Sequence, residues 1–137
     1  MAEIRIKRIY EAMSGDDGFR VLVDRLWPRG ISKERAALDD WWKDIAPSPE
    51  LRTWFGHKAE HFEEFAVKYR VELSTGRAAP THMVTVAEHL AAGENVTLLY
   101  GAKDPAVNHA RVLQEWMYAM MDKGKDIITY EMNTSRM

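Results

Sequence analysis

Residues 21–30 read Val-Leu-Val-Asp-Arg-Leu-Trp-Pro-Arg-Gly, an apolar run that stops abruptly in charged and aromatic residues. The apolar part is typical of a buried strand, which we predict over residues 19–26. In open α/β sheets the ligand crevice lies at the carboxyl ends of the strands. Charged side chains are costly to bury at such an edge unless something pairs with them. The end of this strand is therefore the first candidate site.

Residues 95–100, Asn-Val-Thr-Leu-Leu-Tyr, repeat the pattern, because the predicted buried strand is followed by Lys103 and Asp104. Asp104 is a residue type that caps helices, and Pro105 suits the first helical position. We therefore expect the last long helix to begin here and to end at Gly124. If this strand is parallel to the one quoted above, both charged loops open at the same edge of the sheet.

The composition describes one ordinary globular domain spanning residues 1–137. Of these residues 46% are hydrophobic and 29% are charged, and the formal net charge is -2. Without a global basic excess, nucleic acid is not expected as a partner. The chain has no cysteine, which excludes disulfides and thiolate metal sites.

Nothing in the sequence indicates a membrane. Residues 1–5 lack the apolar core of a signal peptide. No apolar run approaches the roughly 18 residues that a membrane-spanning helix needs. We expect a cytoplasmic protein.

The order of elements predicts a small three-layer α/β domain, with a mostly parallel sheet flanked by helices. The eight residues 11–18 are too few for an ordinary parallel crossover, so the first two strands are either antiparallel or not neighbours. Strands are expected at residues 4–10, 19–26, 95–100 and 127–130, and helices over 59–73 and 81–92. Two shorter helices are expected, one from Lys33 with Ser32 as its cap, and one from Pro49 with Ser48 as its cap and Gly56 as its end. The helix at 81–92 is expected to bury Val84, Ala87, Leu90 and Ala91.

The two strand ends supply most of the candidate site residues. Cations and a helix N-terminus favour an anion such as a phosphate or carboxylate. An acid or an imidazole among them could transfer a proton, and a tryptophan face could stack on a ring. The catalytic candidates are Asp24, His57 and Asp104, and the ligand-binding candidates are Arg25, Trp27, Arg29, Lys33, Arg52, Tyr100, Lys103 and Asn108.

Each candidate also has a purely structural interpretation. Asp24 and Arg25 could pair with residues elsewhere in the fold, Asp104 could serve only as a helix cap, and Trp27 could cover the core. His57 and His61 have the spacing of helical neighbours, but no third ligand is evident, so no metal is assigned. His109 falls on the inward side of its helix, where a satisfied core histidine is the more common finding.

Several segments, at residues 20–34, 42–48, 51–57, 65–73, 98–104 and 108–110, resemble the YeaO-like proteins of the domain of unknown function 488 group. The Asp-Arg-Leu-Trp-Pro-Arg-Gly motif at residues 24–30 is the most specific part of this resemblance. Phe62 stands where the pattern usually has tryptophan. The resemblance implies a small bacterial α/β domain without an established reaction, and it supplies no catalytic roles.

Two classes of function fit these observations. The first is an enzyme that acts on a phosphorylated or nucleotide-like small molecule by hydrolysis or group transfer. The second is a non-catalytic module that binds an anionic ligand or a protein through the same crevice. The residues name no cofactor, substrate or oligomeric state.

Overall fold

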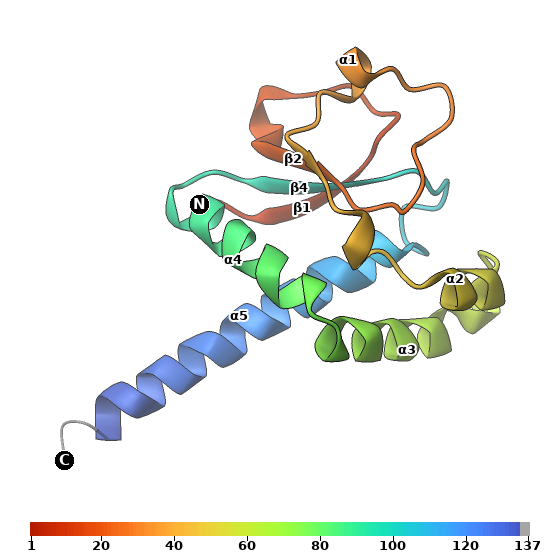
Figure 1. Ribbon diagram of the computed structural model, residues 1–137. Helices are drawn as coiled ribbons and strands as arrows, with labels where there is room; N and C mark the ends of the chain where they lie inside the picture. Colours follow the sequence, from red (N-terminus) through yellow and green to blue (C-terminus); the bar gives the residue numbers. More distant parts are fainter. Residues whose placement is uncertain (135–137) are drawn as a thin grey trace.

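The computed structural model describes residues 1–134, and their side chains up to residue 123. Its centre is a four-stranded sheet in the order β1-β4-β2-β3, formed by β1 (Ile4–Arg8), β4 (Val96–Tyr100), β2 (Phe19–Leu22) and β3 (Asp40–Trp41) (Figure 1). All three pairings are parallel. The expected α/β class is confirmed, and so is the parallel arrangement of the two strands that carry the charged loops.

β1 and β2 are not neighbours, because β4 lies between them. The short connection between them contains the 3-10 helix η1 (Gly15–Asp17), and Gly18 follows it with a φ of 64°. A Cβ at Gly18 would lie 2.1 Å from the carbonyl oxygen of Asn95. Only glycine allows this close approach of the chain to the start of β4.

The helices are α1 (Lys33–Ala36), α2 (Pro49–Phe55), α3 (Phe62–Thr75), α4 (Ala78–Ala91) and α5 (His109–Thr134), with the 3-10 helices η2 (Lys43–Ile45) and η3 (Ala59–His61). Two of the expected caps are confirmed. The Ser32 hydroxyl accepts from the Arg35 N–H, and the Ser48 hydroxyl accepts from the Leu51 N–H. Gly56 ends α2 in the left-handed conformation, as expected.

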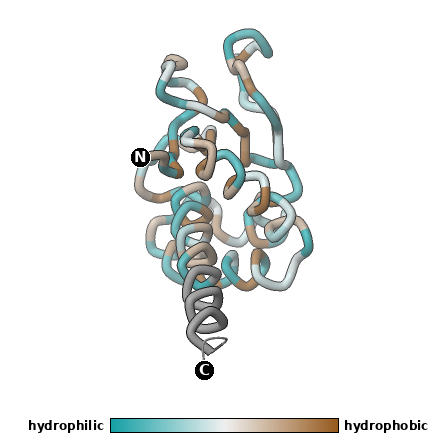
Figure 2. The backbone as a smooth tube through the Cα atoms, turned by 90° about the vertical axis from the view of Figure 1, so that its left-hand side faces the viewer, coloured by the Kyte–Doolittle hydropathy of each residue, from teal (hydrophilic) through white to brown (hydrophobic). Residues whose placement is uncertain are grey.

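The two faces of the sheet are covered differently. α4 and α5 pack against one face, and α3 packs against α5 (Figure 1). The larger hydrophobic cluster lies on this face and includes Val21, Leu98 and Tyr69. The opposite face is covered by the loop around α1, over a smaller cluster that includes Leu22 and Leu99. Figure 2 shows the hydrophobic stretches in the middle of the molecule, between hydrophilic outer loops.

Three expectations about the helices are wrong. α5 begins at His109 rather than at Pro105, and it continues through Gly124 to Thr134. The strand expected at 127–130 is therefore part of α5; a glycine inside a helix costs only about 1 kcal/mol, and it does not have to end one. In α4, Val84 is 59% exposed, Ala87 and Ala91 are also exposed and Leu90 is only partly buried, whereas Ala79 and Val86 are buried.

No helix within the described residues is long and apolar enough to cross a membrane.

A buried group of charges fixes the loop before β2. Asp17 is 4% exposed and Arg20 is 3% exposed, and their side chains form an ion pair. Lys7 Nζ lies 3.1 Å from the Asp17 carboxylate, and the Ser14 N–H donates to it at 3.0 Å. Burial opposes the ionisation of Asp17, but these donors outweigh burial and lower its pKa.

We expect Asp17→Asn to lower the free energy of unfolding by about 3 kcal/mol, because it leaves two cations without their counter-ion. Since the folded state lowers the pKa of Asp17, its carboxylate contributes stability above the ordinary pKa of about 4. That contribution disappears as the pH falls through the lowered value. Urea unfolding from pH 7 to pH 3 should show this loss in the native protein and in the exposed control Asp16→Asn. A variant D17N with the stability and acid response of the control would contradict the assignment.

Candidate functional site

The two charged loops meet at the C-terminal edge of the sheet. The Gly101 N–H, just after β4, donates to Asp24 Oδ2, just after β2, at 2.9 Å. A Cβ at Gly101 would lie 3.0 Å from the same oxygen, so this position favours glycine. The prediction that both loops open at one edge is confirmed.

Two tryptophans hold the loop that follows β2. The Trp41 indole N–H donates to the Asp24 carbonyl oxygen at 2.7 Å, and the Trp27 indole N–H donates to the Ile31 carbonyl oxygen at 2.8 Å. The two indole rings meet edge to face, with centroids 5.3 Å apart. Trp27 packs against the smaller hydrophobic cluster, so its aromatic face contributes to the fold.

His109, the first residue of α5, contacts the end of β2 and the Asp24 carboxylate. Its Nε2 lies 3.0 Å from the Val23 carbonyl oxygen and 3.2 Å from Asp24 Oδ1. The hydrogen bond goes to the carbonyl, so Oδ1 contacts the imidazole without a hydrogen bond of its own in the described part of the chain. His109 was expected to be an inward-facing histidine with its hydrogen bonding satisfied, which agrees with its bond to Val23, and it also lines the cavity described next.

A cavity of about 230 Å³ opens beside this junction. Its charged walls are Asp24, Arg25 and Arg52, and two imidazoles, His57 and His109, also line it. The remaining lining residues are Leu26, Ala46, Pro47, Phe55, Phe65, Gly101, Ala102 and Asn108. The cavity thus combines a cationic surplus with an apolar wall.

Arg25 connects this cavity to a second one. One terminal nitrogen of its guanidinium lies 3.3 Å from the carbonyl oxygens of both Ala46 and Pro47. Its Nε is buried and has no hydrogen-bond partner among residues 1–134. Arg25 also lines the neighbouring cavity of about 330 Å³, between the segment at Ile45 and the end of α3. Its charge is therefore incompletely paired by the protein.

The structure brings together part of the predicted site. Asp24, Arg25, Arg52, His57 and Asn108 line the cavity. Six predicted residues lie outside its walls: Trp27, Arg29, Lys33, Tyr100, Lys103 and Asp104. Arg29, Lys33 and Lys103 are exposed. Tyr100 is only 2% exposed within the core, and burial raises its pKa.

The cap of α5 is Asn108 rather than Asp104. Asn108 is 1% exposed, its side-chain oxygen accepts from the Arg111 N–H at 3.0 Å, and its amide donates to the Asp104 carbonyl oxygen at 2.9 Å. The Asp104 carboxylate instead accepts from the N–H groups of Ala106 and Val107. These two backbone donors lower the pKa of Asp104. Asp104 thus closes a turn that precedes the helix.

No group of three or more His, Asp or Glu residues in the described chain is arranged to hold a metal ion. The His61 ring stacks on Trp54, with centroids 4.8 Å apart.

Asn108→Ala should lower the free energy of unfolding by about 1 kcal/mol, since it removes the cap of α5. Asp104→Ala should have a smaller effect, because it opens an exposed turn outside the helix. Urea unfolding of both variants at neutral pH provides the measurement. The reverse order would mean that Asp104 is the cap.

Comparison with known proteins places this fold in a family. A family model described as "Inactive DUF488-N3 subclade" matches residues 3–135. The chain belongs to this YeaO-like DUF488 family. The resemblance inferred from the motif at residues 24–30 is therefore confirmed.

Bacterial relatives of this family align over most of the chain. The chain is 40% identical over 117 residues to "Uncharacterized protein YeaO" of Escherichia coli (strain K12), covering 85% of this chain and 98% of the relative. It is 41% identical over 112 residues to "Uncharacterized protein Rv3073c" of Mycobacterium tuberculosis (strain ATCC 25618 / H37Rv), covering 82% of this chain and 91% of that protein. No solved structure matches the chain.

Proposed function

We propose that this protein is a binding module for a small anionic molecule and that it does not convert this ligand chemically. The observation that carries the proposal is the cavity at the C-terminal edge of the sheet, where Arg25 and Arg52 face a single carboxylate, Asp24. Two guanidinium charges against one carboxylate leave the lining with a surplus of positive charge. An anion entering the cavity restores the balance.

Among the side chains described up to residue 123, Asp24 is the one carboxylate that lines the cavity, and the protein already engages it. Asp24 Oδ2 accepts from the Gly101 N–H, and Oδ1 lies against the His109 imidazole. Asp24 therefore contacts His109 and does not pair with Arg25 or Arg52, and both guanidinium charges are left to the ligand. The N-terminal end of α5 adds a favourable dipole at the same wall.

The shape of the cavity narrows the ligand class. Its volume of about 230 Å³ is below the roughly 300–1,000 Å³ of pockets that take drug-sized ligands. Phe55, Phe65 and Leu26 supply apolar surface beside the charges. A phosphate or carboxylate on a short apolar body fits this combination.

Two observations support binding without turnover. Asp24 is held by the fold, and Asp104 lies outside the cavity, which leaves His57 as the remaining catalytic candidate at the wall. The family description begins with the word "Inactive", which agrees with a site that has kept its shape without a reaction.

Hydrolysis or group transfer on the same kind of molecule is the second candidate. The observation that favours it is the contact of 3.2 Å between Asp24 Oδ1 and His109 Nε2 at the cavity wall. A carboxylate beside an imidazole is a common acid–base arrangement. The two candidates differ only in whether the bound molecule is converted.

Phenyl phosphate tests both candidates, because it carries an anion on an apolar ring and releases phenol when hydrolysed. Isothermal titration should detect its binding to the native protein, and the Arg52→Ala variant should bind about tenfold more weakly, as for the loss of one charge-assisted hydrogen bond. Arg70→Ala is the matched control, because Arg70 is an exposed arginine on α3 that pairs with Glu115. The proposal fails if phenyl phosphate and inorganic phosphate do not bind, or if both variants behave alike.

The same mixture reports turnover. We expect no release of phenol or inorganic phosphate over prolonged incubation. If phenol appears, and Asp24→Asn binds phenyl phosphate but stops its release, the enzyme candidate replaces the binding module.

A further inference from the structure

A second group of cations lies just outside the cavity and is organised around Tyr10. The Arg8 guanidinium lies over the Tyr10 ring, 5.0 Å from its centroid. The Tyr10 hydroxyl donates to the Arg29 carbonyl oxygen at 2.9 Å, and Arg35 donates to the Tyr10 carbonyl oxygen at 3.2 Å. Tyr10 thus brings together residues from the end of β1, the loop after β2 and α1.

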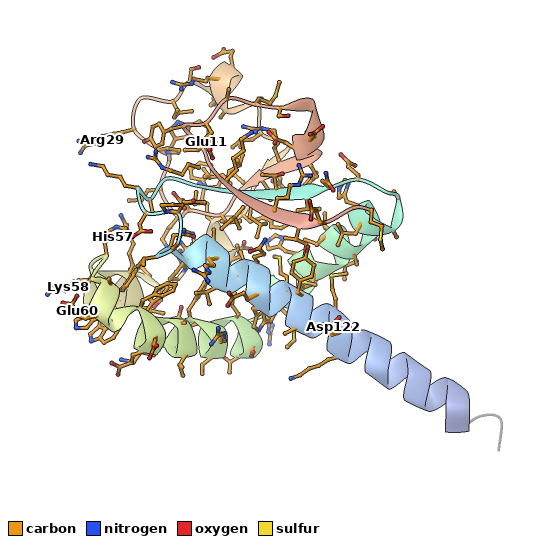
Figure 3. The ribbon with its side chains drawn as sticks, turned by 180° about the vertical axis from the view of Figure 1, so that it is seen from behind. Glu11, Arg29, His57, Lys58, Glu60 and Asp122 are labelled. Carbon is orange, nitrogen blue, oxygen red and sulfur yellow. The ribbon has the colours of Figure 1, made fainter. Side chains whose placement is uncertain are left out.

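This group is continuous with the cavity wall. Arg8 Nε donates to the carbonyl oxygen of Ala102 at 2.8 Å, and Ala102 itself lines the cavity. Lys103 follows directly in the chain and is exposed. Arg8 and Arg35 contact Tyr10 through their guanidinium groups, Arg29 contacts it through its backbone, and Lys103 follows Ala102 of the cavity wall. We call these four cations the rim cluster. Figure 3 shows Arg29 and His57 projecting at the same end of the molecule.

The rim cluster differs from other cations of the domain in how it is paired. Arg5 pairs with Glu3, while Lys7 and Arg20 share Asp17. Up to residue 123, none of the four rim cations has a carboxylate within ion-pair distance.

The nearest acids are also occupied by backbone groups. Glu11 accepts the Arg8 N–H, and Asp104 accepts the N–H groups of Ala106 and Val107. The charges of these acids moderate the local field, but neither Glu11 nor Asp104 forms an ion pair with a rim cation.

From this arrangement we infer that the ligand carries two anionic groups, one held in the cavity by Arg25 and Arg52 and the other held outside by the rim cluster. The inference rests on the proposed binding function and narrows its ligand class to bis-anionic small molecules, such as a phosphate ester that ends in a carboxylate or in a second phosphate. The body between the two groups passes the Gly101–Ala102 turn, because Ala102 lines the cavity and its carbonyl oxygen accepts from Arg8 of the rim.

The test compares alkyl phosphates with carboxyalkyl phosphates of matched and increasing chain length, by isothermal titration at low ionic strength. One length of the carboxyalkyl series should bind the native protein about fivefold more tightly than its alkyl partner, the gain expected from one additional exposed ion pair. Shorter members should gain less, because their carboxylate cannot reach the rim. High salt should reduce the preference.

The double variant Arg29→Gln/Lys103→Gln should bring the ratio of the two dissociation constants close to one. The matched control is Arg77→Gln/Lys123→Gln, which removes one exposed arginine and one exposed lysine far from the rim in the sequence and should keep the ratio.

Three results overturn the inference, and they separate it from the proposed function. If alkyl phosphates bind but no carboxyalkyl phosphate binds more tightly, the cavity is supported and the rim subsite is wrong. If the control variant loses the preference as fully as the rim variant, the effect is general charge attraction. If neither series binds, the proposed function fails together with the inference.

Discussion

The architecture of the site depends on the carboxylate of Asp24. One of its oxygens takes the first N–H after β4, the other lies against the first side chain of α5, and its own backbone carbonyl is held by Trp41. Three segments far apart in the sequence are therefore fixed at one point. Asp24 does this with two hydrogen-bond acceptors, one carboxylate oxygen and its backbone carbonyl oxygen, and with the contact between its other carboxylate oxygen and the His109 ring.

This role explains why the charged motif after β2 can sit beside a buried sheet. Arg25, in the same turn, donates hydrogen bonds to the carbonyl oxygens of Ala46 and Pro47. Trp27 packs over the smaller hydrophobic cluster. The residues of the motif thus have two different roles. Some of its side chains stabilise the loop, and the guanidinium of Arg25 remains incompletely paired at the cavity wall.

Local signals in the sequence predicted local structure well. Ser32, Ser48 and Gly56 marked helix ends that the structure confirms, because each acts through hydrogen bonds or backbone angles within a few residues. The short connection before β2 also excluded a parallel pair with β1 on chain length alone. The parallel pairing of β2 with β4 then placed both charged loops at one edge.

The wrong predictions concern the cap of α5 and the buried face of α4, where more than one residue has the right type for the same position. Asp104 with Pro105 has the pattern of a helix start, but Asn108 is buried at the correct distance from the Arg111 N–H and takes the cap. Helical periodicity correctly placed His109 on the inward side of α5, but it could not show that this side borders a cavity. In α4, a start three residues earlier than expected accompanies a different buried row, Ala79 and Val86 in place of Val84.

The two hydrophobic clusters lie on opposite faces of one sheet and share no side chain. Changes in free energy from substitutions on one face should therefore sum with those from the other where the two sites lie more than about 7–10 Å apart and have no common partner. The sheet acts as a partition. A substitution that repacks the side chains under the loop therefore needs no compensating change in the side chains beneath the helices, as long as the shared strands keep their backbone positions.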